Sequence, residues 1–349
     1  MLSFENDYIQ GCHEKILQAF AESNYEKEPG YGADRYSRSA TERIRQACGC
    51  PGAEVYFISG GTQTNMLTID TMLDSHEGVL AAKTGHIACH EAGAIEFTGH
   101  KVLELPQKDG KINPKDLEQY MQTFLREESR DHLVFPGMVY LSQPTEYGTL
   151  YSEEELREIR RLCDTYELKL YIDGARLIYG LASTCNDVTL PILAEVCDAF
   201  YIGGTKAGAL CGEALVFPRK SPKQFITKVK QHGAMLAKGR LIGIQFDTLF
   251  KDGLYDEISR HAMDMAREIR DAFQEQGYSF HIPLISNQIF VILTEEQRRI
   301  LSQQLRFTLW EPLEGDRCVI RLAASWATTC EEVTELRRIL EQCKEEQVC

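Results

Sequence analysis

The sequence predicts an α/β protein built on a mainly parallel sheet that is covered by helices on both faces. Short apolar runs alternate with longer amphipathic segments over about the first 250 residues, which is the pattern of strands joined by helical crossovers. Polar residues follow several of the apolar runs, where parallel strands present ligand-binding groups. A different pattern follows, in which apolar runs lie closer together, and it predicts a second, smaller unit.

Each expected element of the large unit has a local signal. Asn113 precedes Pro114 as a plausible N-cap, and Ser152 and Glu155 have the spacing of a capping box for a helix that runs to about residue 166. A third helix is expected at residues 62–73, directly after a glycine-rich turn. Short apolar runs predict strands at residues 55–58, 78–82, 101–105, 138–142, 168–172 and 199–202.

The C-terminal part begins with a long helix, expected at about residues 255–276. Apolar runs at 288–293, 306–309 and 318–322 predict strands of antiparallel character, and a final helix is expected at 330–346. We therefore expect an N-terminal segment (1–20) packed on the core, a large domain (21–250) and a smaller C-terminal α+β domain (251–349).

Composition narrows the functional classes. The 349 residues are 43% hydrophobic and 26% charged, as in ordinary globular proteins. The net charge of −14 argues against nucleic-acid or anionic-membrane partners. No apolar run has the length of a membrane helix, the acidic N-terminus does not resemble a signal peptide, and the 12 cysteines include no CxxC pair. We expect a cytoplasmic protein with reduced cysteines.

Lys206 is the most informative residue. It follows a buried-strand pattern and lies in a glycine-rich turn, where desolvation favours the neutral, nucleophilic amine that forms a Schiff base. Asp173 ends an earlier apolar run, so an acid and a lysine are expected at neighbouring strand ends. Pyridoxal 5′-phosphate (PLP) requires this pair, because the acid keeps the pyridine nitrogen protonated and the lysine holds the aldehyde. We therefore interpret the chain as a PLP enzyme.

The turn at residues 59–65, Ser-Gly-Gly-Thr-Gln-Thr-Asn, predicts a seat for the cofactor phosphate. It follows the expected strand at 55–58 and opens a helix, so backbone N–H groups and hydroxyls converge at a helix N-terminus. Gly61 and Thr62 are the expected phosphate-binding residues. Taken alone, such a turn also fits a capped helix without a ligand.

Three further side chains are candidates for the site. His86 follows the expected strand at 78–82 and could stack on the cofactor ring and take part in proton transfer. The alternative is that it is an ordinary histidine in a surface loop. Arg176 could contact the cofactor phenolate oxygen or a substrate carboxylate. Arg321 lies among apolar residues, which predicts either a clamp for the substrate α-carboxylate or a structural ion pair with a nearby acid.

Several segments match one family in order and approximate spacing: Tyr31-Gly-Ala-Asp34, Gly61-Thr-Gln-Thr-Asn65, His86 with Glu91-Ala-Gly93, Asp173-Gly-Ala-Arg176, Thr205-Lys206 and Arg321-Leu322. With them the chain resembles the threonine aldolase branch of the fold type I (aspartate aminotransferase-like) PLP enzymes, which includes β-eliminating lyases. The resemblance implies a small amino-acid substrate and a homotetramer, a dimer of dimers with shared active sites.

The same resemblance assigns roles to individual residues. Lys206 would form the Schiff base, Asp173 would pair with the pyridine nitrogen and His86 would stack on the ring. Further cofactor contacts are implied for Gly61, Thr62, Arg176 and Thr205, with Lys238 and Arg240 reaching a neighbouring subunit's phosphate. Substrate contacts are implied for Asn6, Tyr31, Arg176 and Arg321.

Two positions depart from the family pattern. Asn6-Asp7 replaces the family's Ser-Asp, so a carboxylate contact often made by serine falls to Asn6. Glu146 occupies the place of a histidine near the substrate hydroxyl. A partly buried carboxylate can accept that proton if its pKa is raised, so Glu146 joins Lys206 and His86 as an expected catalytic residue.

The expected reaction is retro-aldol cleavage of a β-hydroxy-α-amino acid, of the L-threonine or L-allo-threonine type, to glycine and an aldehyde. The alternative within PLP chemistry is β-elimination on a small or aromatic amino acid, or transamination or racemisation at Cα. A non-catalytic α/β binding protein and a metal-dependent hydrolase are remote alternatives; His86, His90 and His100 provide no recognisable three-ligand metal spacing.

Overall fold

A computed structural model describes residues 1–348 of the chain, with side chains for residues 1–344. Its large unit contains a seven-stranded sheet in the order β2-β8-β7-β6-β5-β3-β4. Strands β4, β3, β5, β6 and β7 run parallel, whereas β8 is antiparallel to both β7 and β2. The strands are β2 (Glu54–Ile58), β3 (Glu77–Ala82), β4 (Val102–Leu105), β5 (Phe135–Ser142), β6 (Lys169–Asp173), β7 (Ala199–Gly203) and β8 (Glu213–Phe217).

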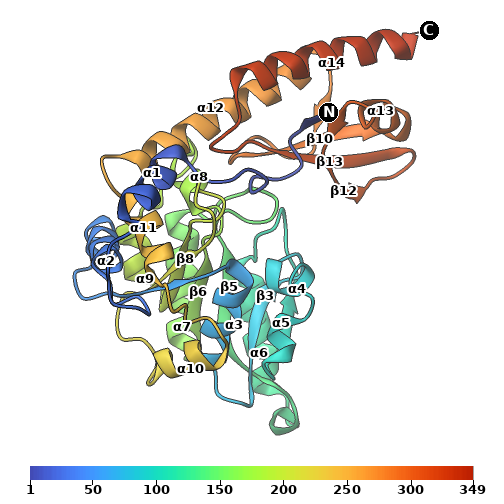
Figure 1. Cartoon of the computed structure of the whole chain (residues 1–349). Coiled ribbons are helices and arrows are strands. Elements are labelled where there is room, and N and C mark those ends of the chain that lie inside the picture. The colour runs from blue at the N-terminus through green and yellow to red at the C-terminus, as the bar shows by residue number, and fades with distance from the viewer. Residues whose placement is uncertain (349) are drawn as a thin grey trace.

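Helices cover both faces of this sheet, as the alternating pattern predicts (Figure 1). The first face carries α2 (Arg35–Ala47), α6 (Pro114–Arg126), α7 (Glu153–Tyr166), α8 (Leu177–Leu181), α9 (Leu190–Val196) and α11 (Arg240–Leu249). The second face carries α3 (Gly61–Met72), α4 (His86–Cys89), α5 (Ala94–Phe97) and α10 (Phe225–Gln231). A short 3₁₀ turn, η1, spans Arg130–His132.

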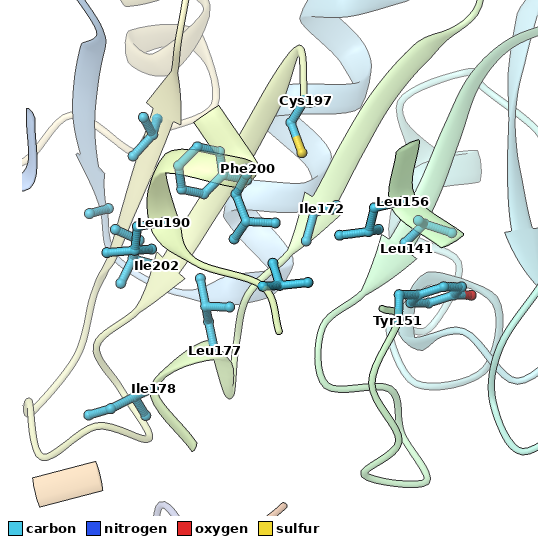
Figure 2. Packing of buried hydrophobic residues seen from close by; sticks show 14 of the residues in the cluster. Leu141, Tyr151, Leu156, Ile172, Leu177, Ile178, Leu190, Cys197, Phe200 and Ile202 are labelled. Carbon is cyan, nitrogen blue, oxygen red and sulfur yellow. The ribbon is translucent and has the colours of Figure 1, made fainter. Parts of the chain in front are cut away.

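Strand alternation explains how one sheet serves two cores. In β7, Phe200 and Ile202 point into the core on the first face, whereas Ala199 and Tyr201 belong to the core on the second. Figure 2 shows the first core, where Phe200 and Ile202 lie beside Leu190. With apolar side chains directed to both faces, the strand is buried throughout, which is why the sequence has a continuous apolar run there.

The smaller unit contains an antiparallel sheet in the order β12-β13-β10-β9. Its strands are β9 (Ser279–Phe280), β10 (Gln288–Thr294), β12 (Thr308–Pro312) and β13 (Arg317–Ala323), and its helices are α12 (Leu254–Glu275), α13 (Glu295–Leu301) and α14 (Cys330–Val348). Figure 1 shows α12 and α14 side by side over this sheet. The predicted strand at 306–309 is two strands, because β11 (Leu305–Arg306) ends before β12 begins.

The N-terminal segment contacts both units. Strand β1 (Leu2–Ser3) pairs in parallel with β11, and α1 (Glu14–Ser23) packs against α11. Helix α12 also serves both units, since Ile258 belongs to the large core and Phe273 to the small one. The division into segments 1–20, 21–250 and 251–349 stays a prediction.

The local signals for helix starts are confirmed. The Asn113 side chain accepts a hydrogen bond from the Lys115 N–H at 2.9 Å, and Ser152 and Glu155 form a reciprocal capping box. Strand β8 and helices α2 and α11 have no counterpart in the sequence prediction. None of the described helices is both long and apolar enough to cross a membrane.

Candidate active site

A cavity of about 340 Å³ opens at the carboxyl ends of β2, β5, β6 and β7. This is where parallel sheets place ligand sites, because strand ends and helix N-termini converge there. The cavity brings together eight of the predicted residues, which are Gly61, Thr62, His86, Glu146, Asp173, Arg176, Thr205 and Lys206.

Asp173 ends β6 and is 4% exposed. Its Oδ2 accepts hydrogen bonds from the Tyr140 hydroxyl at 2.6 Å and from Asn65 Nδ2 at 3.0 Å. Its Oδ1 accepts from the Tyr201 hydroxyl and from the Ala175 N–H. Burial alone would raise the pKa of Asp173, but the nearby His86 and these hydrogen bonds outweigh burial and lower it, so the carboxyl group is kept ionised.

A second buried carboxylate fixes the ring of His86. Glu91 Oε1 accepts from His86 Nδ1 at 2.9 Å and from Asn65 Nδ2 at 2.8 Å, and the Glu91 side chain is fully buried. Asn65 therefore donates to both Glu91 and Asp173, while its Oδ1 accepts from the Tyr171 hydroxyl at 2.8 Å. The predicted roles of His86 and Asp173 are thus linked through one buried amide.

Lys206 lies in the turn after β7 and lines the cavity. Its Nζ makes no hydrogen bond or ion pair within the described part of the chain, and it lies 5.7 Å from the centroid of the Tyr8 ring. Burial and the neighbouring Arg176 guanidinium lower the pKa of Lys206 below its ordinary value. A partly desolvated, unpaired amine is the state that a nucleophilic lysine requires.

The N-terminus of α3 forms an anion seat in the same cavity. The first intrahelical bond runs from the Thr64 N–H to the Gly60 carbonyl at 3.0 Å, and no side chain caps the N–H groups before it. A Cβ on Gly61 would lie 3.2 Å from the Tyr201 hydroxyl, so a side chain there would crowd the seat. This geometry is consistent with the phosphate-binding role that the sequence predicts for Gly61 and Thr62.

Glu146 is 7% exposed and is held beside His86. Its Oε1 accepts from the His86 backbone N–H at 2.9 Å and from the Ser142 hydroxyl at 2.6 Å. Burial raises the pKa of Glu146 above its ordinary value. A buried carboxylate with a raised pKa in the cavity has the properties of a general base.

Arg321, on β13, is 8% exposed and has no carboxylate partner in the part of the chain that the structure describes. Its Nη2 donates to Asn6 Oδ1 at 2.7 Å, and its buried Nε lacks an acceptor. Among the described residues no acid therefore forms an ion pair with Arg321, which lies near Arg176 but is not among the residues that line the cavity. Burial and the nearby Arg176 lower the pKa of Arg321 to about 10. A desolvated guanidinium without an anion is suited to a carboxylate ligand.

Three of the predicted ligand-binding side chains already form hydrogen bonds within the protein. The Thr205 hydroxyl donates to Glu213 at 2.7 Å, so its one proton is already used within the turn, and the cofactor contact expected for Thr205 stays a prediction. The Asn6 side-chain oxygen accepts a hydrogen bond from Arg321, and Arg176 is paired with Asp7 through Nε and Nη2.

Tyr31, Lys238 and Arg240 do not line the cavity with Lys206. Tyr31 is 53% exposed and borders a different cavity, and Lys238 is exposed. Arg240 donates to the backbone carbonyls of Asn24 and Glu26. Within one chain these three residues therefore lie away from the site, and a contact with a cofactor requires a neighbouring subunit.

Sequence reasoning missed the roles of Asn65, Glu91, Asp7 and Glu213. Glu213 had a usable signal, because an acid that opens the apolar run 214–217 is unusual in a buried strand. Asn65 and Glu91 lie in the matched segments, but their shared hydrogen bond joins residues 26 positions apart.

The donor set fits PLP. A fixed, ionised acid, an unpaired lysine and an uncapped helix N-terminus lie in one cavity, and these groups match the pyridine nitrogen, the aldehyde and the phosphate of that cofactor.

The comparisons with known proteins agree with this geometry. A model of the β-eliminating lyase family matches residues 5–296. The low specificity L-threonine aldolase of Pseudomonas aeruginosa is 30% identical over 341 residues, covering 96% of each chain. A structure of Leishmania major threonine aldolase is 41% identical, covers 99% of both chains and superposes with a TM-score of 0.93.

A double mutant of Thermus thermophilus aspartate aminotransferase is 15% identical, covers 98% of this chain and 91% of its own, and gives a TM-score of 0.71. At that identity the match shows the fold alone, and it confirms the expectation of fold type I. The resemblance found in the sequence is likewise confirmed: the chain belongs to the β-eliminating lyase family.

Proposed function

We propose that this protein is a PLP-dependent aldehyde-lyase that cleaves β-hydroxy-α-amino acids of the threonine type to glycine and an aldehyde. The observation that carries the proposal is the convergence of Lys206, Asp173 and the α3 N-terminus on one cavity that also contains the buried Glu146. The similarity to threonine aldolases over 96% and 99% of the chain supports the substrate class.

When bound, PLP supplies the electron sink for the bonds at Cα. Arg321 binds the substrate carboxylate, because its guanidinium is buried and pairs with no acid among the residues that the structure describes. Glu146 accepts the β-hydroxyl proton, and its raised pKa matches it to that task. Asp173 stays ionised and holds a proton at the pyridine nitrogen, while the buried Glu91 keeps the His86 ring in one orientation.

The experiment is a product assay with L-threonine, L-allo-threonine and L-phenylserine, with Lys206→Ala as the control. We expect glycine and an aldehyde in equal amounts from at least one substrate, and none from Lys206→Ala. Ammonia and a keto acid in their place would favour β-elimination, the second candidate, which the matched family model also names. Turnover by Lys206→Ala would overturn both.

We further propose a cytoplasmic homotetramer in which neighbouring subunits complete each site. Tyr31 and Lys238 are exposed and lie away from the cavity of their own chain, which supports a role across a subunit interface. The scattered cysteines support a reducing compartment. Light scattering of the purified protein gives the oligomer size, and a monomer with full activity would contradict the shared sites.

A further inference from the structure

The cavity holds one buried carboxyl group that the proposed chemistry does not use. Glu213 is the first residue of β8 and is 4% exposed. Its backbone pairs with Ile58 at the end of β2 and with Gly203 at the end of β7. Ile58 leads into the α3 seat and Gly203 leads into the Lys206 turn. Glu213 therefore lies between the anion seat and the lysine, and its side chain lines the cavity with both.

Both carboxyl oxygens of Glu213 hold the turn that carries the lysine. Oε2 accepts from the Gly204 N–H at 2.9 Å, and Oε1 accepts from the Thr205 hydroxyl at 2.7 Å. Thr205 Oγ in turn accepts from the Gly212 N–H at 3.1 Å, which closes the turn at its far end. These contacts come from neutral donors. No ion pair joins Glu213 to a lysine or arginine within the described residues.

The charged and titratable groups around Glu213 do not fully balance the negative charge of its ionised form. Asp173 on β6 opposes its ionisation, and the Tyr201 hydroxyl on β7 is already donated to Asp173. Lys206 favours ionisation but does not form a contact, and the Cys211 thiol shares the cavity. Burial is the largest influence and raises the pKa of Glu213 to about 7, so above that pH Glu213 is ionised in the cofactor-free protein.

A phosphate group at the α3 seat would bring a second anion into this space. A phosphate ester carries a charge of about −1.5 to −2 near neutral pH. Two anions in one buried site repel each other, and the weaker acid relieves the repulsion by binding a proton. Asp173 is held ionised by four hydrogen bonds from its neighbours. Glu146 is held at the His86 backbone, whereas Glu213 pairs with Ile58, which leads directly into the α3 seat, so Glu213 is the acid that responds.

We propose that Glu213 takes up a proton from solvent when the phosphate-bearing cofactor binds, so that cofactor loading is linked to pH. The inference rests on the proposed PLP function. In the loaded site Glu213 is a neutral carboxylic acid that still accepts from Gly204 and can donate to an oxygen beside it. Because one proton is bound with each cofactor, affinity falls about tenfold per pH unit above the pH at which the empty site ionises.

Calorimetry on the cofactor-free protein tests this inference. Pyridoxine 5′-phosphate is the probe, because it keeps the ring and the phosphate but lacks the aldehyde that reacts with Lys206. Titrations at pH 8 in two buffers of different ionisation enthalpy give the number of protons taken up. Any proton bound at the ring nitrogen is common to wild type and variants, so the difference between proteins reports Glu213. PLP itself is titrated in parallel as the test of cofactor binding.

The matched variant is Glu213→Gln. Its amide oxygen can accept from the Gly204 N–H and its amide nitrogen can donate to Thr205 Oγ, so both contacts of the turn are kept without a titratable group. We expect wild type to take up about one proton more per site than this variant. We also expect the affinity of the variant to lose the pH dependence that Glu213 causes. Equal uptake by the two proteins would overturn the inference.

A second variant guards against misfolding of the first. Thr205→Val removes a hydrogen bond that favours the ionised form of Glu213, so more of this variant is already protonated at pH 8. We expect its proton uptake to fall below that of wild type; unchanged uptake would contradict the inference. If PLP binds with no difference in uptake, this inference alone fails. If PLP does not bind to wild type at all, the proposed function fails with it.

Discussion

Arg176 donates two hydrogen bonds to Asp7, from Nε to Oδ2 at 2.7 Å and from Nη2 to Oδ1 at 3.0 Å. Asp7 is fully buried and also accepts from Asn287 Nδ2 at 2.9 Å. The pair therefore joins the N-terminal segment, the end of β6 and the smaller unit beside the active-site cavity. The orientation of Arg176 depends on residues that precede the large sheet in the chain.

Replacement of Asp7 by Asn should destabilise the fold in a pH-dependent way. Burial opposes ionisation, but the Arg176 guanidinium lowers the pKa of Asp7 from 3.8 to about 2. Because the pKa of Asp7 is lower in the folded protein than in the unfolded one, its ionisation stabilises the fold. This stabilisation is complete above the unfolded-state pKa and is lost as the pH falls through the folded-state pKa. We expect Asp7→Asn to lower the free energy of unfolding by about 2 kcal/mol at pH 7, measured by urea denaturation. The difference should be clearly smaller at pH 3; an equal difference at both pH values would contradict the pairing.

Glu146→Gln should remove the base that accepts the β-hydroxyl proton. We expect kcat for aldehyde formation to fall by about 10²- to 10⁴-fold. Since burial raises the pKa of Glu146, its basic form is lost at a higher pH than for an ordinary glutamate, and the acidic limb of kcat/KM should lie above pH 4.5. Glu146→Asp is the matched control, which keeps a carboxylate and should keep such a limb. An unchanged acidic limb in Glu146→Gln would assign the base to another group.

Glu91 should act by holding His86 in place. The hydrogen bonds from His86 and Asn65 both end on Oε1, so Glu91→Gln can keep both contacts, whereas Glu91→Ala loses them. By analogy with partners that orient metal ligands, we expect kcat to fall about 10- to 100-fold in Glu91→Ala and less in Glu91→Gln. The loss of kcat in the double variant Asn65→Ala, Glu91→Ala should be smaller than the two single losses combined, because both substitutions disrupt the same hydrogen-bond network. Additive losses in steady-state kinetics would rule out that shared network.

Arg321→Lys should weaken substrate binding more than it weakens the fold. Lysine keeps a positive charge but cannot form the two parallel hydrogen bonds of a guanidinium with a carboxylate. A hydrogen bond to a charged group contributes about 1.5–3 kcal/mol, so we expect KM to rise about 10- to 100-fold. Thermal unfolding is the control. No acid among the described residues would lose its ion-pair partner, so the melting temperature should change little. An unchanged KM would place the carboxylate clamp elsewhere.

The sequence predicted those features of the fold that depend on neighbouring residues. The caps at Asn113 and Ser152 and the continuous apolar run of β7 are local, and all three are present. Strand β8 was missed although residues 214–217 form an apolar run, because the run follows a glycine-rich turn and its antiparallel pairing with β7 and β2 joins distant residues. Long-range pairing is not visible in one sequence.

The site shows the same division. Lys206 and Asp173 could be found because each stands at the end of an apolar run, and parallel strands bring such ends together. The pairing of Asp7 with Arg176 joins residues 169 positions apart. The partners of Arg321 among the described residues, such as Asn6, are likewise distant in the sequence. The hydrogen bond from Thr205 to Glu213 depends on how the turn closes, so the sequence indicated only a general cofactor contact for Thr205.

The most direct test of the account is to find which lysine holds the cofactor. The PLP-loaded protein is reduced with borohydride, digested and mapped by mass spectrometry. We predict one pyridoxyl group per chain, on Lys206, together with loss of the visible absorbance band, and neither in Lys206→Ala. A pyridoxyl group on another lysine, or substrate cleavage by a protein that carries none, would contradict the central claim.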